Sequence, residues 1–124
     1  AVKRGYNSLS TSDSGQFVAA TAFDSYIYIS SDFGSSWSEL SSLGSKGWMD
    51  VAMSSTGQYM YFVVKNGQIY SSDSYGDVSS IVISNEEVNN WRSISSSSSG
   101  AYVYGVVRNG AIYKSDDYGL TWST

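Results

Sequence analysis

The chain has 124 residues, a formal net charge of −4 and no Cys, His or Pro. A chain of this length suits one domain with a buried core. The missing residue types exclude disulfides, thiolate metal sites and Ser-His-Asp triads, and an acidic chain without a basic stripe is not expected to bind nucleic acid.

The opening residues 1–5 show no pattern, and we expect a fraying or processed terminus there. From residue 6 onward the chain repeats. Residues 6–37 align without a gap on residues 48–79, and these align in turn on residues 91–122. Such spacing lies within the roughly 40–45 residues typical of propeller blades. We therefore predict a single domain, 1–124, with repeats at about 6–47, 48–90 and 91–124.

Each repeat is expected to form four short strands. In the second repeat these are predicted at about 48–53, 58–64, 68–72 and 78–83. Asn66-Gly67 separates the second strand from the third and is a strong signal for a type I′ hairpin turn. Asn109-Gly110 repeats this signal, and Asp24-Ser25 is a weaker version.

The segments between these strands are predicted as links and turns. Residues 41–47 and 84–90 are expected to link one repeat to the next. The serine run 95–99 aligns with the turn after the first strand of the second repeat. We therefore interpret it as a turn and not as a flexible linker.

One motif follows the third strand of each repeat, with the spacing S-x-D-x-G-x-[ST]-W. Complete copies consist of Ser30, Asp32, Gly34, Ser36 and Trp37, and of Ser115, Asp117, Gly119, Thr121 and Trp122. The second repeat keeps Ser72, Ser74 and Gly76 but has Val78 and Ser79 at the last two positions. Glycine permits a positive φ, the Asp accepts hydrogen bonds from its own turn, and the Trp is expected to fold back and bury its ring. We therefore interpret Asp32 and Asp117 as turn-forming residues, not as catalytic acids.

This motif resembles the Asp-box of the β-propeller blades found in sialidases, xyloglucan-cleaving enzymes and sortilin-type receptors. The resemblance implies an all-β fold of three four-stranded antiparallel blades, as a partial propeller or one completed by oligomerisation. A β-trefoil has a similar size and repeat number, and it is the alternative. Propellers typically have about 4–8 blades, so two copies of this chain would complete a ring of six.

The second strand of each repeat is apolar on both faces, as Tyr59 to Val64 illustrate. A sheet that is apolar on both faces needs a neighbour on each side, as stacked blades provide. The outer blades therefore need a further partner, and we expect homo-oligomers or filaments joined head to tail. The contacts predicted for this joint are Phe17 from the first repeat and Tyr102, Val103 or Tyr104 from the third.

The residues do not favour catalysis. By resemblance, sialidase catalysis depends on three arginines that bind a carboxylate. It also depends on a Tyr-Glu pair as the nucleophile and on an Asp as the acid. The chain has only Arg4, Arg92 and Arg108, without a recognisable motif around them, and Glu86-Glu87 lies on a predicted link. A fragment of a sialidase-like glycoside hydrolase is the alternative function. No cofactor and no metal are expected. No membrane insertion is expected either, since no run approaches the roughly 20 apolar residues of a spanning helix.

Phe33, Tyr75 and Tyr118 share one motif position, directly before the glycine. Either they are exposed and contact a glycan or protein partner, or each folds back over its own hairpin. We predict a non-enzymatic module that acts by self-assembly and by glycan or protein binding. By resemblance, an extracellular, cell-surface or virion-surface setting is expected. An engineered repeat protein is a third hypothesis, weakened by the worn second motif and the uneven spacing.

Overall fold

The computed structural model describes residues 3–124; the first two residues of the predicted terminus lie outside it. Within that range the chain is all-β, with two short 3-10 helices. None of the described helices is long and apolar enough to cross a membrane. The elements are β1 (Tyr6–Thr11), β2 (Val18–Ser25), β3 (Ile27–Ser30), β4 (Ser38–Glu39), η1 (Ser41–Leu43), β5 (Lys46–Met53), β6 (Met60–Ser72), η2 (Val78–Ser80), β7 (Val82–Ser96), β8 (Val103–Val107) and β9 (Ile112–Ser115).

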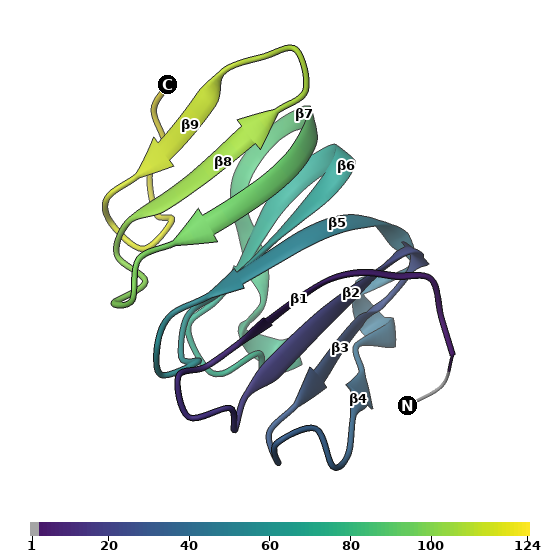
Figure 1. Cartoon of the computed structure of the whole chain (residues 1–124). Coiled ribbons are helices and arrows are strands. Elements are labelled where there is room, and N and C mark those ends of the chain that lie inside the picture. Colours follow the sequence, from purple (N-terminus) through teal and green to yellow (C-terminus); the bar gives the residue numbers. More distant parts are fainter. Residues whose placement is uncertain (1–2) are drawn as a thin grey trace.

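The strands are antiparallel and follow one another from β4 at one end to β9 at the other (Figure 1). The first repeat contains β1 to β4, with the central strand β2 between β1 and β3. The two long strands β6 and β7 each take the place of two of the expected strands. β6 provides the second and third strands of the second repeat, and β7 closes the second repeat on β6 before it opens the third repeat on β8. In the third repeat β9 is followed by a bridge between Lys114 and Ser123.

The predicted hairpin turns form, but they need glycine because there is no room for a side chain and not because φ is positive. Asn66 and Asn109 have φ of 53° and 55°, whereas Gly67 and Gly110 are not among the residues with positive φ. The type I′ prediction is therefore wrong at its second residue. A Cβ on Gly67 would lie 2.6 Å from Cγ1 of Val64, so the close approach of the strand requires glycine.

Two predicted links are partly regular structure. Residues 84–90 belong to β7, because Asn85 pairs with Ile69 and Asn90 pairs with Lys65 of β6. Residues 41–47 contain η1 and the start of β5.

The fourth strand of the second repeat begins at Val82 and not at residue 78. Residues 78–80 form η2 instead, and Oδ1 of Asp77 accepts a hydrogen bond from Ser79 N at 2.9 Å at the start of this turn.

The turn predicted at residues 95–99 is confirmed. β7 ends at Ser96, and Oγ of Ser97 accepts a hydrogen bond from Tyr102 N at 3.1 Å. The serines therefore belong to an ordered turn whose hydroxyl groups bond backbone amides.

The repeats pack face to face in chain order, with one apolar cluster at each boundary. The first cluster joins the first two repeats and is built from Ala19, Ile27, Ile29, Leu40, Trp48, Val51, Met53, Met60, Phe62 and Val64. The second cluster joins the last two repeats and is built from Ala52, Tyr61, Val63, Ile69, Trp91, Ile94 and Val103. The first and third repeats thus cover opposite faces of the second. This row of sheets is not a β-trefoil, whose three repeats would close around a common axis.

Candidate interaction surface

The motif turns are held by the side chains that the sequence indicated. Ser30 Oγ accepts a hydrogen bond from Gly34 N at 2.9 Å and donates one to Asp32 Oδ1 at 2.8 Å. Asp32 in turn accepts hydrogen bonds from Ser36 Oγ at 2.5 Å and from Ser36 N at 2.8 Å. These bonds, above all the one from the Ser36 hydroxyl, hold the pKa of Asp32 below its ordinary value. The third repeat has the same bonds among Ser115, Asp117, Gly119 and Thr121.

The incomplete motif of the second repeat keeps its serine, but its carboxylate comes from a different position, Asp77. Ser72 Oγ accepts a hydrogen bond from Gly76 N at 3.0 Å, as in the other repeats. Asp77 then accepts hydrogen bonds from the hydroxyl and the amide of Ser79, which lower the pKa of Asp77. The turn therefore forms without the motif Asp and Trp.

The motif tryptophans fold back over their hairpins as predicted. Nε1 of Trp37 donates to Gly34 O at 3.1 Å, and Nε1 of Trp122 donates to Gly119 O at 3.2 Å. Both rings are only half-buried, so the predicted burial of the rings is confirmed in part. Trp122 also donates to Ser84 Oγ at 3.1 Å and packs on the second apolar cluster. Trp37 packs on a smaller cluster of Ala20, Ala22 and Tyr28 and also lines an open hollow.

The motif aromatics reach across the boundaries between repeats. Tyr75 lies 4.7 Å from Phe17 and Tyr118 lies 4.6 Å from Tyr59, measured between ring centroids. Each tyrosine therefore packs on the preceding repeat, a contact that neither sequence interpretation foresaw. Phe33 belongs to the first repeat, and it is 67% exposed.

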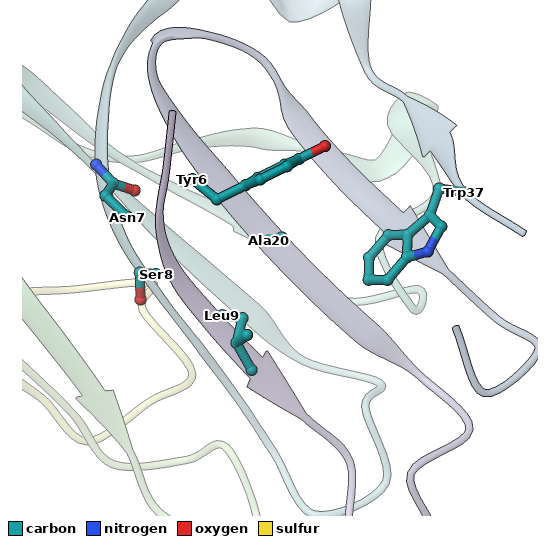
Figure 2. A pocket seen from close by; sticks show the side chains of 6 residues that line it. All are labelled: Tyr6, Asn7, Ser8, Leu9, Ala20 and Trp37. Carbon is teal, nitrogen blue, oxygen red and sulfur yellow. The ribbon is translucent and has the colours of Figure 1, made fainter. Parts of the chain in front are cut away.

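The first repeat presents a hollowed apolar face, which we call the leading face: Tyr6, Leu9, Ala20 and Trp37. Leu9 is 69% exposed, although Val51 and Ile94 at the same position of the other repeats are 4% and 5% exposed. Ala20 forms the floor between the side chains of Tyr6, Leu9 and Trp37 (Figure 2). The hollow measures about 500 Å³, and Asn7 and Ser8 complete its lining.

The third repeat presents a bulky apolar face, which we call the trailing face: Tyr102, Tyr104, Val106 and Ile112. Tyr104 and Ile112 are 45% and 64% exposed. At both positions the first two repeats have residues with no exposed surface, namely Ala19, Tyr61, Ile27 and Ile69. Positions that are buried between repeats are therefore exposed on the outer face of the third repeat.

Two residues predicted for a joint between copies lie elsewhere. Phe17 packs on the first apolar cluster beneath Tyr75, and Val103 is buried in the second cluster. Both therefore face the second repeat, and the prediction of joint contacts is wrong for them. Tyr102 and Tyr104 do lie on an open face.

Asp50 ties the first strands of all three repeats together. Its carboxylate accepts hydrogen bonds from Ser8 Oγ at 2.5 Å, Ser93 Oγ at 2.6 Å and Ile94 N at 2.9 Å. Ser8, Asp50 and Ser93 occupy the same position of the repeat, so the sequence signal for this role is an Asp where the other repeats have Ser.

The residues considered for catalysis are engaged elsewhere or exposed. Arg4 contacts Glu39 at 3.7 Å and donates to Tyr28 OH at 3.1 Å. Glu87 accepts a hydrogen bond from the hydroxyl of Tyr113 at 2.7 Å. Arg92 and Arg108 are exposed on the third repeat. Among residues 3–124, no group of three His, Cys, Asp or Glu side chains could hold a metal ion.

No protein-family model and no curated protein matches the chain. Among solved structures, the β-propeller domain of Myceliophteria thermophila Cps50 (Swd1) matches with a TM-score of 0.75 and 13% identity, over 99% of this chain and 39% of that one. YCF48 bound to D1 peptide matches with a TM-score of 0.78 and 15% identity, over 97% of this chain and 40% of that one. The Niastella koreensis GH74 enzyme matches with a TM-score of 0.72 and 18% identity, over 95% of this chain and 17% of that one.

This chain therefore spans less than half the length of each of these proteins. At such low identity the likeness shows the fold alone, which is of the β-propeller type.

Proposed function

We propose that this chain is a non-enzymatic Asp-box propeller module that assembles with further copies and presents the assembled surface to a glycan or protein. In this proposal each repeat is one blade. The observation that carries it is the contrast between the middle blade and the outer ones. Tyr61 and Ile69 of the middle blade have no exposed surface. Tyr104 and Ile112, at the same positions of the third blade, are 45% and 64% exposed. Contiguous apolar surfaces of more than a few hundred Å² usually mark interaction sites.

The row of motif aromatics is the proposed surface for a glycan or protein ligand. Phe33, Tyr75 and Tyr118 recur at the same motif position of each blade, and all three rings are exposed in part. Rings of this kind stack on sugars and fill pockets of protein partners. Similar folds serve unlike roles: one of the matched structures holds a peptide and another is an enzyme. An extracellular or virion-surface setting remains our expectation.

The alternative, a fragment of a glycoside hydrolase, finds less support. Asp32 and Asp117 have their carboxylates committed to their own turns. A glycosidase needs an acid and a second carboxylate facing one another across a cleft. The arrangement of these two residues instead supports a role in forming the turns.

Molar mass in solution tests the assembly. We expect light scattering at micromolar concentration to show species of at least twice the 13.4 kDa of one chain. A monomer at every concentration up to about 1 mM would refute the proposal, because the exposed faces would then not bind each other.

A further inference from the structure

We propose that Tyr104 of one copy enters the hollow on the leading face of a second copy, while Phe33 of that second copy stacks on Tyr102. The inference rests on the assembly proposed above and identifies its contacts. Two copies of the chain are the occupants of each other's open faces. The argument extends contacts that already occur at the two boundaries within the chain.

The first argument is the repeated ring pair. Tyr75 packs on Phe17 at the first boundary and Tyr118 packs on Tyr59 at the second, with the ring planes tilted by 34° and 38°. In each pair the motif aromatic of one repeat meets the residue that opens the second-strand region of the preceding repeat. The same register pairs Tyr102 with an aromatic at this motif position, and Phe33 of another copy supplies one.

The second argument is side-chain size. At the first boundary the small Ala19 of the first repeat lies in one cluster with the large Phe62 of the second. At the second boundary this is reversed, because Tyr61 takes the position of Ala19 and Gly105 takes that of Phe62.

The open faces continue this second pattern. Tyr104 stands at the position of Tyr61, and Ala20 stands at the position of Gly105. The bulky residue of the trailing face therefore meets a small one on the leading face. The hollow of about 500 Å³ next to Ala20 is the space that this substitution leaves.

The third argument is polar. Tyr61 OH donates a hydrogen bond of 2.6 Å to Gly100 O across the second boundary. At the proposed joint the corresponding pair is Tyr104 OH and Gly15 O of the second copy. The turns beside it are also linked, because Asp13 N donates to Ser55 O at 2.8 Å and Ser55 N donates to Ser98 O at 2.7 Å. The next bond in this series runs from Ser98 N to Asp13 O of the second copy.

The fourth argument is the room above Gly15. A Cβ on Gly57 would lie 2.8 Å from Cβ of Phe17, and one on Gly100 would lie 2.8 Å from Cβ of Tyr59. At Gly15 the nearest atom to such a Cβ, among the described residues, belongs to Phe33 at 3.9 Å. The corresponding aromatic of the neighbour, Tyr102, therefore has an open place at Gly15.

The joint connects unlike faces, and this gives it a specific signature in mixing experiments. An interface of this kind either closes into a ring or continues as a filament. A chain with a blocked leading face keeps a working trailing face, and the reverse also holds. Two variants that each fail to self-associate should consequently bind one another.

The experiment uses Leu9→Asp to block the leading face and Tyr104→Asp to block the trailing face. Leu9 is 69% exposed and Tyr104 is 45% exposed in the single chain, so we expect both variants to fold, which circular dichroism checks. Val88→Asp is the matched control, because Val88 is 68% exposed and lies on neither face. Sedimentation velocity measures the mass of each variant alone and of the equimolar mixture.

We expect each single variant to weaken self-association at least tenfold, and Val88→Asp to assemble like the wild type. The mixture should form a 1:1 pair that grows no further. Assembly of the wild type without any loss in Tyr104→Asp or Leu9→Asp would overturn the joint while leaving the proposed assembly intact. The same holds if only one variant dissociates, because the contact would then join like faces. It also holds if mixing does not restore a pair, because the two intact faces would then not bind each other. A monomeric wild type would instead refute the proposed function itself.

Discussion

The ring of Tyr118 lies 4.6 Å from the ring of Tyr59, so a residue of one turn motif stabilises the boundary with the preceding repeat. Aromatic pairs contribute about 0.5–1.5 kcal/mol beyond the burial of their surface. We expect Tyr118→Ala to lower the free energy of unfolding of the single chain by about 1–2 kcal/mol. Urea denaturation of the dissociated chain measures this.

Phe33→Ala is the matched control for that change. Phe33 has the same backbone conformation, with φ of 60° at both residues, but it is 67% exposed. Its replacement should alter the stability of the single chain by less than about 0.5 kcal/mol. Equal losses at Phe33 and Tyr118 would show that these aromatics stabilise their own hairpins.

The two motif tryptophans should differ in their contributions to stability. Trp122→Ala removes a ring that packs on the second apolar cluster, and we expect a loss of about 3 kcal/mol. Trp37→Ala should cost less, about 1–2 kcal/mol, because its ring packs on the smaller cluster of Ala20, Ala22 and Tyr28 and its other side lines the open hollow. Thermal unfolding of both variants at low concentration tests the order. Ser79→Ala, at the same motif position, is the control and should change stability by less than about 0.5 kcal/mol.

Asp50 should be the most important carboxylate for stability. Hydrogen bonds to charged groups contribute about 1.5–3 kcal/mol each, and the partly buried Asp50 accepts such bonds from the first and third repeats. We expect Asp50→Ala to lower the free energy of unfolding by about 2–3 kcal/mol. Asp116→Ala removes an exposed carboxylate 3.5 Å from Lys114 and should cost less than about 0.5 kcal/mol. The interpretation fails if the two variants are equally stable.

Acid should weaken the fold through the motif turns. Hydrogen bonds from hydroxyl and amide groups lower the pKa of Asp32, Asp77 and Asp117 in the folded chain. A carboxylate with a lowered folded-state pKa contributes stability above its unfolded pKa of about 3.9, and this is lost as the pH falls through the folded value. We expect stability to decline below about pH 4. The double variant Asp32→Asn, Asp117→Asn should be less stable at pH 6 and show a shallower decline, as denaturation across this pH range will reveal.

The local structure could be predicted from the sequence, because each turn depends on a few neighbouring residues. Ser30, Asp32 and Gly34 bond within one turn, so their spacing alone indicates the contacts. The β-propeller type of fold was likewise predictable from the repeat length and the motif.

Contacts between repeats were harder to predict. Alternation places Phe17 on a particular face of its strand, but it does not say which neighbour covers that face. Tyr75 covers Phe17, and this requires the position of the second repeat relative to the first. The role of Asp50 was missed for the same reason, since its partners lie in two other repeats.

The strand β7 passes from the second repeat into the third without a break, and it pairs with β6 on one stretch and with β8 on the next. The first and second repeats are joined differently, through η1 and two residue pairs between β2 and β5. Rotation at the second boundary must break pairs that β7 makes with β6 or β8, whereas the first boundary can open through the exposed serines 41, 42 and 45. Under mechanical load or protease attack, the first repeat should therefore detach before the second and third repeats separate, and the last two should yield as one cooperative unit.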